Sequence, residues 1–107
     1  MIIPKRTYNP TGIQGDDVLS TSDLVRFSEL VSSDWLESAL DKNHSSVGAF
    51  VDLDHIAPAY IDDTILTKAT ITKVAPRKIS YRITTTNPST NELIGICKHN
   101  RVIIRFN

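Results

Sequence analysis

The sequence predicts an α+β domain in which one helix is followed by a run of antiparallel strands. Three observations lead to this class. A single amphipathic segment spans residues 21–40. Four later segments are rich in β-branched residues or alternate between apolar and polar residues. Short turns separate most of these segments, and the clearest turn is 87–91, with the sequence NPSTN.

The segment 21–40 has the features of an amphipathic helix. Ser20, Thr21 and Ser22 offer side-chain oxygens for an N-cap, and Asp23 would lie favourably in the first turn. Further apolar residues widen the apolar arc, so we expect the helix to be covered on more than one side. The main apolar residues recur at spacings of three and four and are Leu24, Phe27, Leu30, Val31, Leu36 and Leu40.

Strands are expected at 47–55, 64–74, 79–86 and 92–106. His44 is expected in the loop before the first of them, and Pro58 follows its end because proline cannot donate to a ladder. The first 17 residues predict a short extended segment near Ile2 and Ile3 and then a loop. The apolar residues expected on one face of the strand 47–55 are Val47, Ala49, Val51 and Leu53.

The composition sets limits on the class of protein. The 107 residues fit a single domain, 1–107, and so small a domain leaves apolar surface that an oligomer can cover. The formal net charge of zero gives no reason to expect nucleic acid or an acidic membrane as partner. No apolar run approaches the ~20 residues of a spanning helix. The single cysteine, Cys97, cannot form an internal disulfide, so we expect a cytoplasmic protein with a buried thiol.

Three polar residues stand out as candidates for chemistry, and each has a simple structural explanation. Thr21 could serve only as an N-cap, and Glu29 could be a solvated helix residue with Arg26 as neighbour. His55 could be a histidine satisfied at a strand end. No metal site is expected, because the histidines and Cys97 lack the spacing of a ligand set.

Two motifs carry a resemblance to a known family. The run 47–58, VGAFVDLDHIAP, places a small residue, a strand, a histidine and Ala-Pro in order, and the run 93–102 is LIGICKHNRV. Glu29 follows Thr21 by 8 positions, and His55 follows Glu29 by 26. In this order and spacing, residues 18–106 resemble the fluoroacetyl-CoA thioesterase-type branch of the hotdog superfamily.

The resemblance implies a hotdog fold, with one central helix wrapped by a curved antiparallel sheet of about five strands. It implies an acyl-CoA thioesterase for small or medium acyl groups, in which Thr21, Glu29 and His55 form the catalytic set. Gly48 is where the resemblance places an oxyanion donor, although a glycine at a strand start also has a purely structural explanation. Coenzyme A would be part of the substrate, and no cofactor is implied. The partner implied is a second copy in a homodimer, and a dimer of dimers is left open.

Helix geometry restricts how these residues can meet. If one straight helix begins at Thr21, Glu29 lies roughly 12 Å further along its axis, at ~1.5 Å per residue. Either the helix starts later and the chain folds back, or the site is shared across a dimer. We favour the shared site, because hotdog dimers join their sheets edge to edge and place acyl-CoA between subunits.

Two other functions stay open at this stage. One is a non-catalytic hotdog module that binds acyl-CoA or a small ligand, which polar helix residues such as Asp23 and Arg26 favour. The other is a hotdog enoyl hydratase or dehydratase, ranked lower because the order of residues matches the thioesterase branch. Fold similarity alone does not decide between them.

Basic residues outside the catalytic set could serve coenzyme A. His99 and Arg101 could hold a phosphate or a neighbouring chain, although a solvated strand face explains them equally well. Lys73, Arg77 and Lys78 cluster at a turn and could contact nucleotide phosphates. A plain exposed turn is the more conservative interpretation of this cluster.

Overall fold

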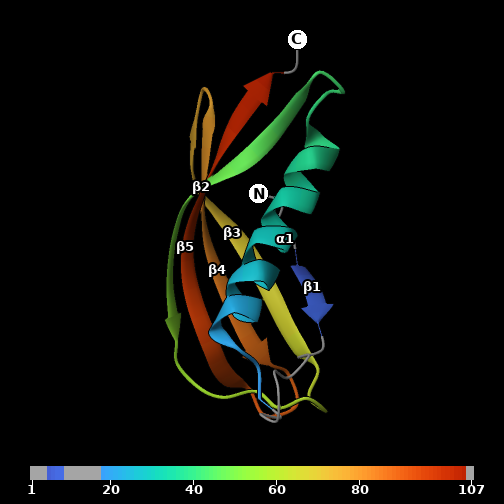
Figure 1. The fold of residues 1–107 in the computed structure, drawn as a ribbon, viewed down its shortest axis with the longest axis vertical. Helices are drawn as coiled ribbons and strands as arrows, with labels where there is room; N and C mark the ends of the chain where they lie inside the picture. The colour runs from blue at the N-terminus through green and yellow to red at the C-terminus, as the bar shows by residue number, and fades with distance from the viewer. Residues whose placement is uncertain (1–4, 9–17, 106–107) are drawn as a thin grey trace.

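The computed structural model describes residues 5–8 and 18–105, and the arrangement is that of a sheet crossed by one helix (Figure 1). The sheet is antiparallel, with the strand order β1-β3-β4-β5-β2, and α1 lies against one of its faces. This confirms the expected α+β class. Within these residues no helix is long and apolar enough to span a membrane. The elements are β1 (Lys5–Tyr8), α1 (Thr21–Ala39), β2 (His44–His55), β3 (Ile65–Ala75), β4 (Lys78–Asn87) and β5 (Glu92–Arg105).

Helix α1 begins at Thr21, and its cap is Ser20. The Ser20 hydroxyl oxygen accepts a hydrogen bond from the backbone N–H of Asp23 at 3.0 Å, which satisfies one of the free donors of the first turn. Ser28 and Ser32 are buried on the face toward the sheet, and their hydroxyls donate to backbone carbonyls within the helix. These small side chains let the helix lie close to the sheet.

The core lies between α1 and the sheet and has two parts. Near the N-terminal half of the helix, the buried residues are Leu19, Leu24, Phe27, Ala59, Ile65 and Ile94. Near its C-terminal half they are Val31, Leu36, Ala69, Ile79, Tyr81, Ile83 and Cys97. Gly95 is needed in the first part, because a β-carbon on this residue would lie 2.7 Å from Leu24 Cδ2. This close approach fixes the position of the helix start relative to the first residues of β5.

A bulge in β2 changes which side chains face the helix. The pairing of β2 with β5 shifts between Gly48 and Phe50, so Ala49 is the extra residue. The expectation that Val47 shares a face with Val51 is therefore wrong, because one extra residue reverses the alternation. The inward face holds Gly48 before the bulge and Leu53 after it.

Two segments expected to be loops are strands. Lys5–Tyr8 forms β1 and pairs with β3, which gives the outer edge of β3 a partner. His44 is the first residue of β2 rather than part of the preceding loop, because β5 extends far enough to pair Arg105 with it. The expected extended segment at Ile2 and Ile3 lies outside the described residues.

Candidate functional site

Thr21 and His55 meet at the N-terminal end of α1. Thr21 is the first residue of the helix, and His55 is the last residue of β2. The Thr21 hydroxyl oxygen lies 2.9 Å from Nδ1 of His55, at hydrogen-bonding distance, although 34 positions separate the two residues. The helix start and the strand end thus form a shared corner that fixes the orientation of the imidazole ring.

The second ring nitrogen of His55 has no such partner. Nε2 is buried, and the described residues offer it no hydrogen bond. A buried polar nitrogen without a partner is uncommon in proteins, and such atoms bond to water or a ligand in many sites. The imidazole therefore has one nitrogen held by Thr21 and one available for chemistry.

Glu29 lies two turns further along α1 and faces Gly48 in β2. A β-carbon on Gly48 would lie only 3.1 Å from Glu29 Oε2 and 3.3 Å from Cε1 of His99. The carboxylate thus occupies the space that any other residue at position 48 would fill. Glu29 is half-buried, so its carboxylate is partly shielded by the protein while it stays within reach of solvent.

A buried pair of basic residues, His99 and Arg101, lies near the Glu29 carboxylate. The Nδ1–H of His99 donates to the backbone carbonyl of Phe50 at 2.8 Å, which leaves Nε2 to accept from Arg101 Nη1 at 3.2 Å. The Arg101 guanidinium also donates to the Ser46 hydroxyl at 2.9 Å. The alternative that His99 and Arg101 lie on a solvated strand face is wrong, since their exposed fractions are 0% and 7%.

Burial controls the charge of this pair. Loss of water lowers the pKa of His99, and the bond to Phe50 opposes this only in part, so the imidazole is neutral near pH 7. Burial also lowers the pKa of Arg101, while the negative charge of Glu29 raises it. Arginine keeps its proton under these conditions, so the carboxylate of Glu29 has a buried cation nearby.

Neither Tyr81 nor Cys97 is ionised in this interior. Burial raises the pKa of the Tyr81 hydroxyl to about 12 and that of the Cys97 thiol to about 11. Cys97 was expected to be a small buried residue, and its exposed fraction of 1% confirms this. A thiol with so high a pKa is a poor nucleophile. Across residues 5–8 and 18–105, no three His, Cys, Asp or Glu side chains gather as a metal site.

The four expected site residues therefore form two groups within one chain. Thr21 and His55 lie together at one end of α1, and Glu29 and Gly48 lie together further along it. The alternative that the helix starts after Thr21 is wrong, since α1 begins at that residue. About 12 Å along the helix axis separates Thr21 from Glu29. In one chain, the two groups do not make direct contact.

The burial of His99 and Arg101 in the interior was not predicted from the sequence. A signal was available, because the alternation of a strand places residues 97, 99 and 101 on one face. Because Cys97 is predicted to be buried, strand alternation also predicts that His99 and Arg101 point toward the interior. Ser46 accepts a hydrogen bond from Arg101, but no pattern in the sequence predicts this contact. The bulge in β2 interrupts the alternation from which the face of Ser46 would be predicted.

Comparisons with solved structures agree on the fold. A thioesterase superfamily member of Thermus thermophilus has a TM-score of 0.86 at 18% identity, covering 97% of this chain and 82% of that one. A 1,4-dihydroxy-2-naphthoyl-CoA thioesterase from Synechocystis has a TM-score of 0.82 at 16% identity, with 98% and 84% covered.

A variant of the fluoroacetyl-CoA-specific thioesterase FlK, solved in complex with fluoroacetate and CoA, gives a TM-score of 0.85 at 18% identity. The match covers 97% of this chain and 93% of that one. The TM-scores establish the fold, which is the expected hotdog fold. A comparison with curated proteins gave no match.

The family comparison covers almost the whole sequence. The model that matches describes the fluoroacetyl-CoA-specific thioesterase FlK, and the match runs over residues 2–107. The motifs around His55 and Gly95, the single helix and the corner formed by Thr21 and His55 all lie within the matched residues. The chain therefore belongs to the fluoroacetyl-CoA-specific thioesterase family.

Proposed function

We propose that this protein hydrolyses the thioester of a small or medium acyl-CoA, releasing the free acid and coenzyme A. The observation that carries the proposal is the hydrogen bond of 2.9 Å between Thr21 and His55, in a chain of a thioesterase family. The bond orients a histidine whose other nitrogen has no partner in the described residues. A histidine held in this way can transfer protons near neutral pH.

The proposed chemistry assigns one task to each residue. The Glu29 carboxylate accepts a proton from water as the water oxygen bonds to the thioester carbon. The backbone N–H of Gly48 donates to the oxyanion that forms. The bond between carbon and sulfur then breaks, and His55, which carries a proton before this step, delivers it to the departing thiolate. Glu29 afterwards loses to solvent the proton that it took from water, and His55 takes one up from solvent, so both groups return to their starting state. Thr21 keeps the imidazole in place for this step.

We propose further that the site is shared between two copies of the chain. Strand β2 is at one edge of the sheet, and long open edges favour pairing with another chain. Large apolar side chains are exposed along it, with exposed fractions of 45% for Val47, 48% for Phe50 and 39% for Val51. A second copy paired antiparallel along this edge would cover them.

The direction of such pairing would bring the two groups of site residues together. In an antiparallel pair of β2 strands, the half of one strand that ends at His55 lies beside the half of the other strand that contains Gly48. Thr21 and His55 of one copy would then approach Glu29 and Gly48 of its partner. This arrangement is compatible with the separation of about 12 Å between Thr21 and Glu29 within one chain.

The primary test is release of free thiol from a panel of acyl-CoAs of increasing chain length, including fluoroacetyl-CoA. Wild type is compared with Glu29→Gln, which keeps the size of the side chain, and with His55→Asn, which is smaller and removes the titratable ring. Hydrolysis that falls at least ~100-fold in both variants supports the assignment. A fully active Glu29→Gln variant defeats it. Binding of the panel without hydrolysis by the wild type points instead to a non-catalytic module.

Mixed dimers test the shared site directly. Glu29→Gln chains and His55→Asn chains are unfolded together and refolded at equal concentrations. If the site is shared, each mixed dimer has one intact site, and about a quarter of the wild-type activity returns. If each copy uses its own Glu29 and His55, the mixture stays inactive. Each variant refolded alone is the control.

The cellular location is an inference from composition. We infer a cytoplasmic protein, because its one cysteine, Cys97, is a free and buried thiol. Enzymes that act on acyl-CoA meet their substrate inside the cell, which agrees with this inference. Exposure of the thiol to a modifying reagent before and after unfolding would check its burial.

A further inference from the structure

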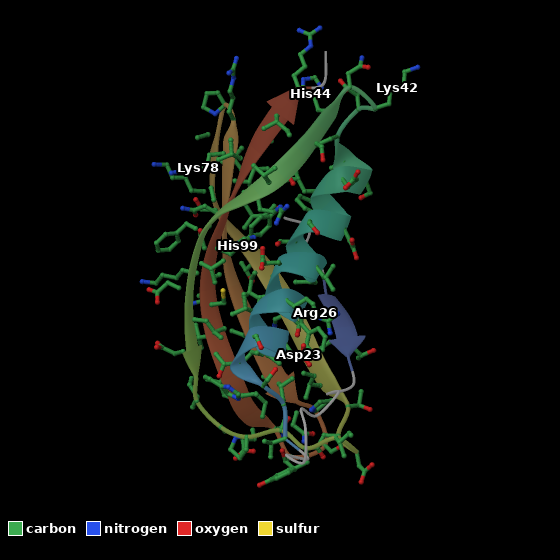
Figure 2. All side chains as sticks on the ribbon, in the orientation of Figure 1. Asp23, Arg26, Lys42, His44, Lys78 and His99 are labelled. Atoms are coloured by element: carbon green, nitrogen blue, oxygen red, sulfur yellow. The ribbon has the colours of Figure 1, made fainter. Side chains whose placement is uncertain are left out.

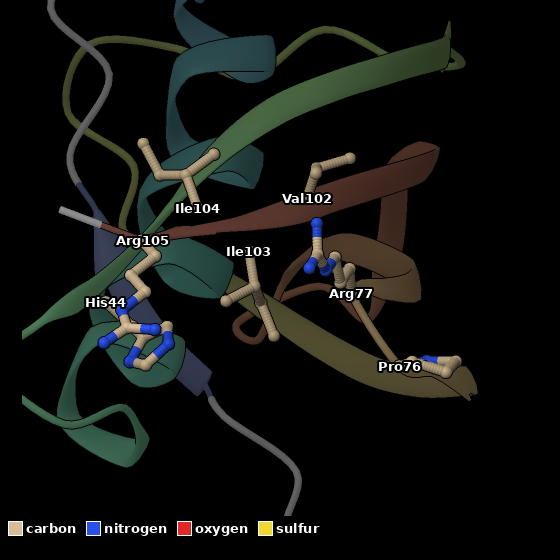
Figure 3. Close-up of a pocket in the computed structure, with 7 residues that line it drawn as sticks. All are labelled: His44, Pro76, Arg77, Val102, Ile103, Ile104 and Arg105. Carbon is tan, nitrogen blue, oxygen red and sulfur yellow. The ribbon is translucent and has the colours of Figure 1, made fainter. Parts of the chain in front are cut away.

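Two hollows in the described part of the chain differ in position and chemistry. The larger, of about 570 Å³, lies between the end of β5 and the turn from β3 to β4 (Figure 3). The smaller, of about 340 Å³, is lined by side chains from β2, β3, β4 and β5 and is called the outer pocket below. No carboxylate lines it. The residues that give it its chemistry are Phe50, Thr72, Ser80, Arg82, Lys98 and Asn100.

The strand pairing places the outer pocket on the face of the sheet away from α1. Tyr81 packs against Trp35 of α1, and His99 is its direct partner in β5, so both side chains point toward the helix. Side chains alternate along a strand, so the pairs one residue to either side point the other way. These pairs are Ser80 with Asn100 and Arg82 with Lys98. The outer pocket thus lies across the sheet from the proposed catalytic site.

Short side chains beside long ones create the hollow. Asn100 is paired with Phe50 on one side and with Ser80 on the other, so an aromatic wall stands next to a low row. Lys98 and Arg82 form the adjacent row, and both are exposed. The exposed fraction of Phe50 is 48%, so its ring offers free apolar surface at the edge of the hollow.

Two cations stand side by side in the outer pocket. Arg82 and Lys98 are direct partners in the pairing of β4 with β5, which puts their β-carbons about 5 Å apart. Like charges in this position destabilise a sheet. Asp52 is the partner of Lys98 in β2, but no carboxylate of the described residues forms an ion pair with either cation. An anion bound between them removes the repulsion.

We propose that the outer pocket binds a small organic acid through its carboxylate. The carboxylate bridges the guanidinium of Arg82 and the ammonium of Lys98, since a guanidinium fork matches two carboxylate oxygens. The apolar part of the acid lies against Phe50, and the amide of Asn100 donates one further hydrogen bond. The volume of about 340 Å³ is at the small end of the range for ligand pockets, which suits a small acid.

The aromatic wall separates this ligand from other anions. Inorganic phosphate and acetate can use the two cations, but they have no apolar part to bury against Phe50. The free acid that the proposed reaction releases has both parts, so acids of this class are present where the protein acts. Binding in the outer pocket needs no hydrolysis, and it therefore stands apart from the proposed function.

The proposed dimer leaves the outer pocket open. A second copy that pairs along β2 adds a strand in the plane of the sheet, about 4.8 Å from β2. Such a strand lies beside Phe50 and does not cover Arg82 or Lys98, which belong to β4 and β5.

Amide chemical shifts in nuclear magnetic resonance spectra, recorded while phenylacetate is titrated into the whole chain, test the outer pocket. In Arg82→Gln and Lys98→Gln, we expect Kd to rise about tenfold, because each variant loses a charge-assisted hydrogen bond. Lys68→Gln is the matched control, because Lys68 is an exposed lysine on the same face of β3 outside the pocket. In wild type, the amides expected to shift with a single Kd are those of Ser80, Arg82, Lys98 and Asn100.

The same titration of His55→Asn separates the outer pocket from the catalytic site. Because the two sites lie on opposite faces of the sheet, this variant should keep the wild-type Kd at the outer-pocket amides. Shifts confined to the surroundings of Glu29 and His55 would overturn the proposal. A wild type that hydrolyses acyl-CoA but shows no shift in the outer pocket overturns the pocket and leaves the thioesterase assignment standing.

Two further results would also overturn the proposal. One is a Kd that is unchanged in both cation variants or that rises equally in Lys68→Gln, which would indicate a loss of net charge alone. The other is equal affinity for phenylacetate, acetate and inorganic phosphate, which would show that Phe50 contributes nothing and that the cations attract any anion. Thermal melting confirms that each variant is folded.

Discussion

Glu29 and Gly48 lie so close that the carboxylate oxygen Oε2 is 3.1 Å from the point where a β-carbon on Gly48 would be. The two residues belong to different elements, α1 and β2, so their contact depends on how the helix lies on the sheet (Figure 2 shows the described side chains on the ribbon, with His99 labelled). His99 closes the same space from β5, with its Cε1 at 3.3 Å from that point. The Glu29 carboxylate can therefore occupy its observed position only because residue 48 has no side chain.

Replacing Gly48 by alanine tests this relationship. Gly48→Ala keeps the backbone N–H proposed for the oxyanion but forces the Glu29 carboxylate or the His99 ring to move by a few tenths of an ångström. We expect kcat/KM to fall ~10–100-fold, since small displacements of catalytic groups have effects of this size. Thermal melting should change little, because the carboxylate is the flexible end of a side chain. Wild-type kcat/KM in this variant would show that the carboxylate position is unimportant.

The bond between Thr21 and His55 gives a second prediction. Thr21→Val removes the hydroxyl and keeps the shape, and we expect kcat to fall ~10–100-fold because the imidazole loses its fixed orientation. Thr21→Ser keeps the hydroxyl at 2.9 Å from the ring and is the matched control, with kcat within a few-fold of wild type. Equal activity of the two variants would remove Thr21 from the proposed catalytic set. Thr21 is exposed, so neither change should lower the free energy of unfolding by more than ~0.5 kcal/mol.

Local patterns in the sequence predict where the helix and most of the strands lie, but they do not predict which side chains meet between them. Ser20 as a cap and the spacing of Leu24, Phe27 and Val31 define where α1 starts and which side it buries. The meeting of Thr21 with His55 depends on a pairing across 34 positions, which no local pattern specifies. It was expected only through the resemblance to a family, and the structure supplies the distance.

The bulge at Ala49 could not be predicted from the alternation of apolar and polar residues. Gly48, Ala49 and Phe50 give no sign in the sequence that the phase of the strand reverses between them. The reversal puts Gly48 under Glu29 and brings the carbonyl of Phe50 to His99. A bulge forms when pairing with a neighbouring strand demands it, so its position depends on β5 as much as on β2.

Gly95 gives a prediction about stability. A β-carbon on Gly95 would lie 2.7 Å from Leu24 Cδ2 and 3.2 Å from the backbone carbonyl oxygen of Asp54, in a part of the core with no exposed surface at Leu24. Gly95→Ala should therefore lower the free energy of unfolding by ~1–3 kcal/mol through overpacking. Urea denaturation measures this, and Gly48→Ala is the comparison, because its added methyl group meets the flexible end of the Glu29 side chain and the edge of the His99 ring instead of the Leu24 side chain. An unchanged midpoint for Gly95→Ala would show that α1 can move away from the sheet at little cost.

The buried imidazole of His99 predicts how stability depends on pH. Burial holds its pKa in the folded protein below the ordinary value of 6.5, while the unfolded chain has that ordinary value. As the pH falls below about 6.5, the unfolded state binds a proton that the folded state does not, so the folded state loses stability. The groups facing the ring are the carbonyl of Phe50, the guanidinium of Arg101 and the carboxylate of Glu29. We expect the free energy of unfolding to fall as the pH drops below about 6.5, by at most ~1.4 kcal/mol per pH unit from this group.

The control for this prediction is His99→Gln, whose amide can still donate to the Phe50 carbonyl and accept from Arg101 but does not titrate. Urea denaturation of both proteins at a series of pH values gives the two slopes. A flatter slope in the variant assigns the acid sensitivity to His99. Equal slopes would mean that a protonated imidazole is tolerated beside the Glu29 carboxylate, and the neutral state of His99 would then have to be abandoned.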